Sequence, residues 1–152
     1  MSISRAIERA YRISQERNYS NIYWSLDLHG TVIESTYDTF SHDWINEKIR
    51  PILAELASFP ETYLILWSSL RPEEQPKMIE FFESQGISVF AFNENPLEAN
   101  TKTGHFDQKF YTSIIVDDKA GFEVHEWPDV IHAVRHYREK HGFKIRENSQ
   151  TI

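Results

Sequence analysis

The sequence predicts an α/β fold in which a doubly wound parallel β-sheet lies between helices, forming three layers. Segments with the composition of strands alternate along the chain with segments that have helical periodicity. The strand-like segments are apolar at nearly every position, which is typical of strands that are buried on both faces. The length of 152 residues, of which 40% are hydrophobic, suits a single domain over residues 1–152 with a sizeable core.

The first helix and the first strand are predicted near the N-terminus. Ser2 or Ser4 can cap a helix that runs to about Asn18 and carries apolar residues on one side. The segment 22–28 (IYWSLDL) is rich in β-branched and aromatic residues, and the turn-forming sequence HGT follows it. This segment is therefore expected to form the first strand.

Three further helices and three further strands are predicted to follow. Residues 43–59 have a helical pattern, in which Pro51 must start or kink part of the helix. The apolar run 62–67 (TYLILW) predicts a second strand that is buried on both faces. The remaining elements are a helix opened by Pro72 and ended by Gly86, strands at 87–92 and 112–116, and a helix at about 128–141.

The composition makes several classes of partner and site improbable and excludes those that need cysteine. A formal net charge of −7 disfavours nucleic acid and anionic membranes as partners. No apolar run reaches the roughly 18 residues of a transmembrane helix, and the opening MSISRAIERAYRIS lacks the apolar core of a secretory signal. The absence of cysteine excludes disulfides and thiolate metal sites. The expected location is the cytoplasm.

Polar side chains follow the predicted strands at the points where the strands end. Asp27 ends the first strand, Ser68 and Ser69 end the second, and Asp117 and Asp118 end the last. Because the carboxyl ends of parallel strands meet at one edge of a sheet, where ligands bind, these groups are expected to converge. Each residue alone also fits a turn, a helix cap or a solvated loop, so the prediction depends on their joint occurrence.

The converging groups have the chemistry of phosphoryl transfer. Carboxylates suit Mg²⁺, which prefers oxygen ligands, and a carboxylate can also attack phosphorus to form an aspartyl-phosphate. A hydroxyl group and the ammonium of Lys109, eight residues before Asp117, could hold the oxygens of a phosphate. Gly30 would allow a tight turn beside the metal.

Four stretches resemble the motifs of the haloacid dehalogenase (HAD) superfamily. LDLHGTV at Leu26–Val32 resembles the first motif, normally DxDGT[VL], and LILWSS at Leu64–Ser69 resembles the second. Lys109 stands where the third-motif lysine occurs, and IIVDDKAGF at Ile114–Phe122 resembles the acidic fourth motif. The resemblance covers most of the chain and, with NENP at residues 93–96, is closest to small capless phosphatases of phage and bacterial type.

The resemblance implies an HAD-like Rossmannoid fold with an extra N-terminal helix and no large cap. It implies that Asp27 is the nucleophile, that Ser68 or Ser69 binds the phosphoryl group, and that Lys109 or Lys102 steadies the phosphate. The other residues expected to contact substrate are Gly30, Thr31 and Asn93. Mg²⁺ would be held by Asp27, Asp117 and the backbone carbonyl of His29, with Asp118 helping directly or through water.

His29 departs from the family pattern. The family's phosphatases carry an aspartate there, two residues after the nucleophile, as general acid and base; such catalysis is worth about 10²–10⁴-fold. Histidine could substitute, because its unperturbed pKa near 6.5 suits proton transfer at neutral pH. Two functions stay open: a phosphoric-ester hydrolase or phosphotransferase acting through Asp27, and a catalytically weak HAD-like protein that binds a phosphorylated ligand or a protein partner.

Two other classes of protein fit less well, and the site is expected to be open. A receiver-type phospho-acceptor domain would carry its acidic pair after the first strand, and the P-loop pattern GxxxxGK[ST] does not occur. The connection between Thr31 and the next predicted helix, about a dozen residues, is too short for a large cap. An open site favours a large or macromolecular phosphorylated substrate, or closure of the site by a partner subunit. The four tryptophans are predicted to lie in the core: Trp24, Trp44, Trp67 and Trp127.

Overall fold

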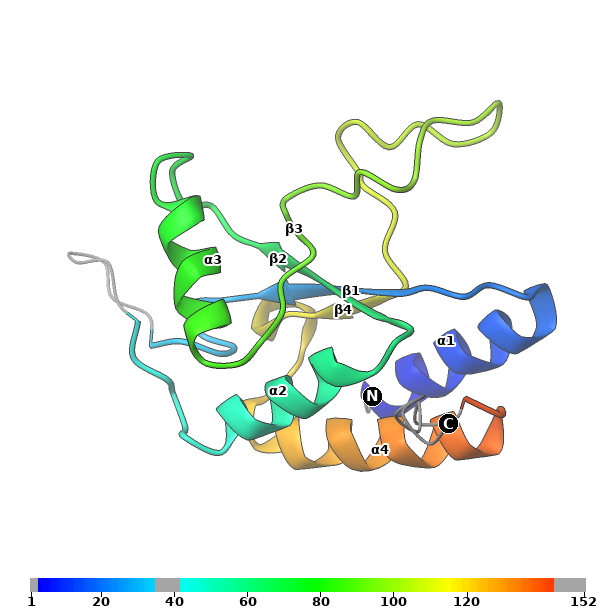
Figure 1. Cartoon of the computed structure of the whole chain (residues 1–152), viewed down its shortest axis with the longest axis horizontal. Coiled ribbons are helices and arrows are strands. Elements are labelled where there is room, and N and C mark those ends of the chain that lie inside the picture. The colour runs from blue at the N-terminus through cyan, green and yellow to red at the C-terminus, as the bar shows by residue number, and fades with distance from the viewer. Residues whose placement is uncertain (1–2, 35–41, 144–152) are drawn as a thin grey trace, which may run out of the picture.

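A four-stranded parallel sheet forms the centre of the protein (Figure 1). The computed structural model describes residues 3–34 and 42–143. The strands follow the order β3-β2-β1-β4, with all neighbours parallel. They are β1 (Ile22–Asp27), β2 (Thr62–Trp67), β3 (Ala91–Phe92) and β4 (Ile114–Val116). The predicted α/β class with a parallel sheet is confirmed.

Four α-helices and two short 3₁₀ helices accompany the strands in the described part of the chain. They are α1 (Ile3–Arg17), α2 (Ile49–Ser58), α3 (Gln75–Ser84), α4 (Trp127–Lys140), η1 (Asp118–Ala120) and η2 (Val124–Glu126). Gly86 follows α3 with a φ of 80°, the left-handed conformation expected of a residue that ends a helix. None of the described helices is long and apolar enough to cross a membrane.

One face of the sheet packs against the helices. Successive strand residues point to opposite faces, and the even-numbered ones point to this side. Figure 1 shows α1, α2 and α4 together below the sheet, and residues of α3 join the same core. This main core includes Trp24, Leu26, Leu64, Leu66, Ile114 and Val116 from the strands and Ile7, Leu53, Phe82 and Val134 from the four helices.

The other face of the sheet has a small aromatic cluster instead of a helical layer. Tyr23, Ile65 and Ala91 are buried there, and the side chains packed against them are Tyr63, Phe90, Phe110 and Tyr111. No helix of the described residues contributes to this cluster, and the segment 93–113 lies on this side (Figure 1, yellow-green). The predicted second layer of helices is thus not confirmed.

Two strand residues on the helix-free face are exposed. Trp67 is 43% exposed and Ile115 is 52% exposed. The prediction that these strands are buried on both faces is therefore wrong at both positions. The core prediction is confirmed for Trp24 and Trp127, each 1% exposed, and is wrong for Trp67.

Some element boundaries differ from the prediction because tertiary contacts use the backbone differently. The helix predicted from residue 43 begins at Ile49, since Trp44 forms a bridge with Ile33 and the Asn46 side chain accepts a hydrogen bond from the Lys48 N–H. The strands predicted at 87–92 and 112–116 are reduced to β3 and β4 at the two edges of the sheet. Ser2 and residues 35–41 of the short connection that excludes a cap lie outside the described residues.

A buried ion pair connects three elements below the amino ends of the strands. Glu61, just before β2, accepts hydrogen bonds from Arg138 of α4 through Nε (2.7 Å) and Nη2 (3.0 Å). Tyr11 of α1 donates a third hydrogen bond to Glu61 (2.8 Å). The side chains of Arg138 and Glu61 are only 5% and 4% exposed, and the Arg138 guanidinium lies 4.1 Å from the ring centre of Phe59.

Candidate metal and phosphate site

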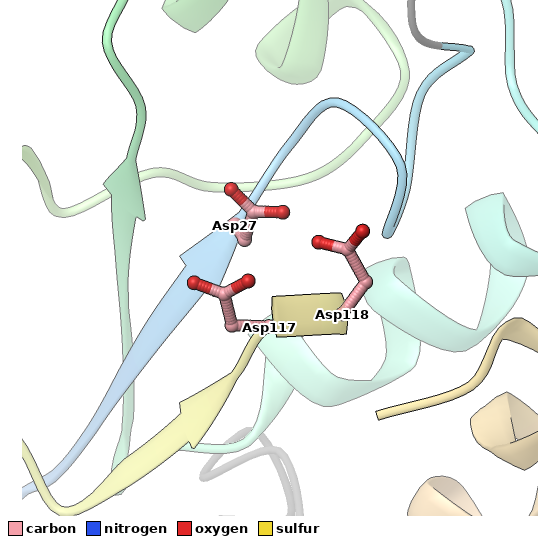
Figure 2. A group of neighbouring side chains, drawn as sticks. All are labelled: Asp27, Asp117 and Asp118. Carbon is pink, nitrogen blue, oxygen red and sulfur yellow. The ribbon is translucent and has the colours of Figure 1, made fainter. Parts of the chain in front are cut away.

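Three aspartates meet at the carboxyl end of β1 and β4 (Figure 2). Asp27 is the last residue of β1, Asp117 precedes η1, and Asp118 is the first residue of η1. One carboxylate oxygen from each lies within 4.8 Å of the others. In the sheet, β2 lies on one side of β1 and β4 lies on the other, so the strand order reverses at β1. Parallel sheets usually bind ligands at the carboxyl ends of the strands beside such a reversal, and the acidic cluster lies there.

The hydroxyl group of Thr31 connects two parts of this acidic cluster. It donates to Asp27 Oδ2 at 2.8 Å and accepts from the Asp118 backbone N–H at 3.0 Å. A hydroxyl group has one proton, so the longer 3.4 Å approach to Asp118 Oδ1 cannot be donated at the same time. Thr31 is fully buried, and its contact with substrate stays a prediction.

The turn that carries Thr31 is held from two sides. Gly30 has a φ of +90°, and a Cβ at this position would lie 2.9 Å from Asp118 Oδ2, so both the backbone conformation and the space favour glycine. The Trp127 indole N–H donates to the Thr31 carbonyl at 3.0 Å. The sequence predicts only that Trp127 lies in the core, because a hydrogen-bond partner 96 residues away leaves no local signal.

The environment of Asp27 makes ionisation of its carboxyl group less favourable than in water when no cation is near. Burial, followed by the negative charges of Asp117 and Asp118, raises the pKa of Asp27 from 3.8 to about 6, against the opposing hydrogen bond from Thr31. Three clustered carboxylates repel one another, and a divalent cation would remove this repulsion. The ligand atoms are all oxygens, which is the donor type that Mg²⁺ prefers.

His29 lies in the turn after β1 and is half-buried. Burial lowers the pKa of its imidazole below the usual value, which favours the neutral ring at neutral pH. Its backbone carbonyl accepts no hydrogen bond from the described part of the chain. This carbonyl is therefore available to a ligand, and its role in holding a metal stays a prediction.

Asn93 holds the backbone of Ser68. The Asn93 side chain accepts from the Ser68 N–H at 2.9 Å and donates to the Ser68 carbonyl at 2.7 Å, so that two hydrogen bonds connect the ends of β3 and β2. Asn93 has a φ of 57°, a left-handed conformation that asparagine tolerates better than most residues. The contact between Asn93 and substrate stays a prediction, whereas its two hydrogen bonds to Ser68 are present in the structure.

The remaining candidates are less closely placed. The Ser68 hydroxyl is half-buried and accepts from the Leu70 N–H at 3.2 Å, whereas Ser69 is exposed. Lys102 and Lys109 are exposed in the segment 93–113, and neither forms a hydrogen bond or an ion pair with the described residues. The structure thus brings the three aspartates, Thr31 and Gly30 together but does not bring either lysine to them.

Comparisons with known proteins add evidence on the fold. No family model and no curated protein matches the chain. A solved structure of a conserved protein from Bacteroides thetaiotaomicron is similar, with a TM-score of 0.59 over 76% of this chain and 91% of that chain. The two sequences are 21% identical, so the likeness concerns the fold alone.

Proposed function

We propose that this protein is an HAD-like phosphoryl-transfer protein, a Mg²⁺-dependent phosphatase or phosphotransferase that acts through an aspartyl-phosphate on Asp27. The observation that carries the proposal is the convergence of Asp27, Asp117 and Asp118 within 4.8 Å beside the Thr31 hydroxyl. In the same proposal the sheet is the core of an HAD-like Rossmannoid fold. Here α1 is the extra N-terminal helix, and the irregular segment 93–113 takes the place of the second helical layer of a doubly wound, three-layer arrangement.

The proposed metal ligands are oxygens of the acidic cluster. Asp27, Asp117 and the His29 carbonyl would hold Mg²⁺, and Asp118 would help directly or through water. When bound, the ion would neutralise negative charge on the phosphate oxygens. An oxygen ligand set with repelling carboxylates supports this assignment.

In the proposed reaction, a carboxylate oxygen of Asp27 attacks the phosphorus atom of a phosphate monoester. The bond from phosphorus to the leaving-group oxygen breaks, and this oxygen takes a proton from His29 or from solvent. Water then gives a proton to His29 or to solvent and attacks the phosphorus of the aspartyl-phosphate, which releases inorganic phosphate and restores Asp27. The Ser68 hydroxyl would donate to a phosphate oxygen during both steps.

A second candidate function is a catalytically weak protein that binds a phosphorylated ligand or a protein partner. The environment of His29 favours this alternative, because burial lowers the pKa of the imidazole and disfavours the protonated form that would donate to the leaving group. Without a general acid the first step would be slow by about 10²–10⁴-fold. Binding through the acidic cluster and its metal would remain.

Replacement of Asp27 tests the proposal. Release of inorganic phosphate from a panel of phosphorylated metabolites should require Mg²⁺ and stop with EDTA. Asp27→Asn keeps the size of the side chain but removes the attacking oxygen's charge, so turnover should vanish. The matched control is Asp129→Asn on the exposed first turn of α4, which should leave turnover unchanged. Full activity in folded Asp27→Asn protein would rule out the aspartyl-phosphate.

A further inference from the structure

An exposed tryptophan lies next to the proposed nucleophile. Trp67 is paired with Asp27 in the register of β2 and β1. Side chains at paired positions of neighbouring parallel strands point to the same face, and neighbouring strands lie about 4.8 Å apart. Trp67 is 43% exposed, whereas Trp24 and Trp127 are each 1% exposed. A large apolar ring therefore faces solvent one strand away from Asp27.

The indole of Trp67 is supported on one side by Phe110. Their ring centres are 5.4 Å apart with an angle of 60° between the planes. Phe110 is itself half-buried against the aromatic cluster of the helix-free face, so it holds the indole over that face. We refer to these two rings as the Trp67–Phe110 pair. The two rings form contiguous apolar surface that stays partly unburied beside Asp27, and contiguous surface of this kind can mark a binding site.

The position of this pair defines which part of a substrate could reach it. In the proposed reaction the phosphorus atom must lie about 3 Å from an Asp27 oxygen. The leaving-group oxygen lies opposite the attacking oxygen, so a ring attached to it projects away from Asp27, on the face of the sheet where Trp67 stands one strand spacing, about 4.8 Å, to the side. The Trp67–Phe110 pair contains no charged group, so it favours a flat, uncharged ring that can stack on aromatic side chains.

We propose that the Trp67–Phe110 pair is the binding site for the leaving group of the substrate, and that this leaving group is a planar aromatic ring attached directly to the phosphate, as in a phenyl phosphate. The proposal rests on the proposed function, because it requires a phosphate at Asp27. It gives the open, helix-free face of the sheet a specific role in the choice of substrate.

Non-hydrolysable phosphonates test this proposal on the unmodified protein. Calorimetry in the presence of Mg²⁺ should give phenylphosphonate at least a threefold to tenfold lower Kd than methylphosphonate, on the scale of one aromatic stacking contact. Cyclohexylphosphonate, which has a ring of similar size that is not flat, should bind more weakly than phenylphosphonate. Equal affinity for the cyclohexyl and phenyl compounds would overturn the assignment to a planar ring.

Variants then assign the preference to Trp67. Trp67→Leu should weaken phenylphosphonate binding about threefold to tenfold and leave methylphosphonate binding unchanged, while Trp67→Phe should keep most of the preference. The matched control is Tyr19→Leu, which removes a ring that is 46% exposed before the amino end of β1, away from Asp27. Circular dichroism would establish that each variant is folded.

The outcomes separate this proposal from the function on which it rests. If methylphosphonate binds with Mg²⁺ but the phenyl group adds no affinity, the aromatic subsite is wrong and the phosphate site stands. If no phosphonate binds with Mg²⁺, the proposed function fails, and the subsite fails with it. A phenyl preference that survives Trp67→Leu but is lost in Tyr19→Leu would also overturn the assignment.

Discussion

Thr31 shows how one buried residue can organise a site. Its hydroxyl donates to the Asp27 carboxylate and accepts from the Asp118 N–H, while its carbonyl accepts from the Trp127 indole. The sequence places Thr31 in a turn beside the expected phosphate, but the partners of its hydroxyl depend on which distant segments pack there. The residue types of the cluster could thus be predicted, whereas this supporting network could not.

In the proposed function, His29 is the residue whose replacement distinguishes an enzyme from a binding protein. If it is the general acid, His29→Ala should lower turnover by roughly 10²-fold or more, and His29→Asp should preserve or raise turnover, because it restores the aspartate of the family pattern. The measurement is phosphate release at saturating Mg²⁺. A nearly inactive wild type that gains activity only with His29→Asp would favour the second function. Equal turnover of His29→Ala and wild type would exclude the acid role.

Asn93 is expected to contribute to stability and to the placement of Ser68. Asn93→Ala removes both hydrogen bonds to the Ser68 backbone and places a Cβ-bearing residue without a polar side chain at a φ of 57°. The expected loss in the free energy of unfolding is about 2–4 kcal/mol, measured by urea denaturation. Asn93→Gly also lacks the amide but relaxes at positive φ, so it should be more stable than Asn93→Ala by about 1 kcal/mol.

Both Asn93 variants should bind phosphate with Mg²⁺ more weakly if Ser68 is a phosphate ligand. Unchanged stability of both would show that the two hydrogen bonds do not hold the end of β2.

At the scale of elements, the ion pair between Glu61 and Arg138 fixes α4 to the start of β2. Arg138→Met should lower the free energy of unfolding by about 3–5 kcal/mol, because it leaves the Glu61 carboxylate buried without its cation. Arg135→Met is the matched control on the same helix, since Arg135 pairs with Glu55 at the surface and should contribute at most about 1 kcal/mol. Thermal or urea melts of both variants measure the difference. Similar losses would mean that burial does not decide the strength of these pairs.

The order and type of the elements could be predicted, but their lengths depended on contacts between distant residues. The 62–67 strand has the predicted bounds, and the last helix, Trp127–Lys140, is one residue from its predicted range at each end. The helix expected from residue 43 starts later because Trp44 pairs with Ile33, which the local pattern cannot show. The β3 strand is short because it lies at an edge of the sheet, where β2 is its one hydrogen-bonding neighbour among the described strands.

For the whole molecule, the charge of Asp27 should make stability depend on pH. The folded-state pKa of about 6 lies above the usual 3.8, so the folded protein binds the proton more tightly than the unfolded chain does. The cost of ionising Asp27 is absent below about pH 4 and complete above about pH 6. Metal-free wild type should therefore lose about 1–2 kcal/mol across this window, allowing for partial exposure.

The comparison with Asp27→Asn measures this cost. The variant should be more stable than metal-free wild type at pH 7, and the two should converge near pH 4. Mg²⁺ should raise the melting temperature of wild type but not of Asp27→Asn. If the difference in the free energy of unfolding between wild type and Asp27→Asn were the same at pH 4 and pH 7, the raised pKa assigned to Asp27 would be wrong.

The face of the sheet without helices could not be predicted from strand composition. Apolar residues such as Trp67 and Ile115 suggest that both faces of their strands are buried. In the structure, however, these two side chains are 43% and 52% exposed. The acidic cluster was predicted more fully, because it follows directly from where parallel strands end. Lys102 and Lys109 form no contact with the acidic cluster in the structure. They lie in a segment without regular secondary structure, whose course cannot be predicted from hydrophobic periodicity.

The hydrogen bond between Trp127 and Thr31 has a consequence for synthesis of the protein. Residue 127 leaves the ribosome 96 residues after residue 31, some 5–20 s later at typical translation rates of about 5–20 residues per second. During that interval β1 and its turn exist without the indole that holds them. The turn that carries Thr31 therefore acquires this hydrogen bond only after α4 has been synthesised and has docked.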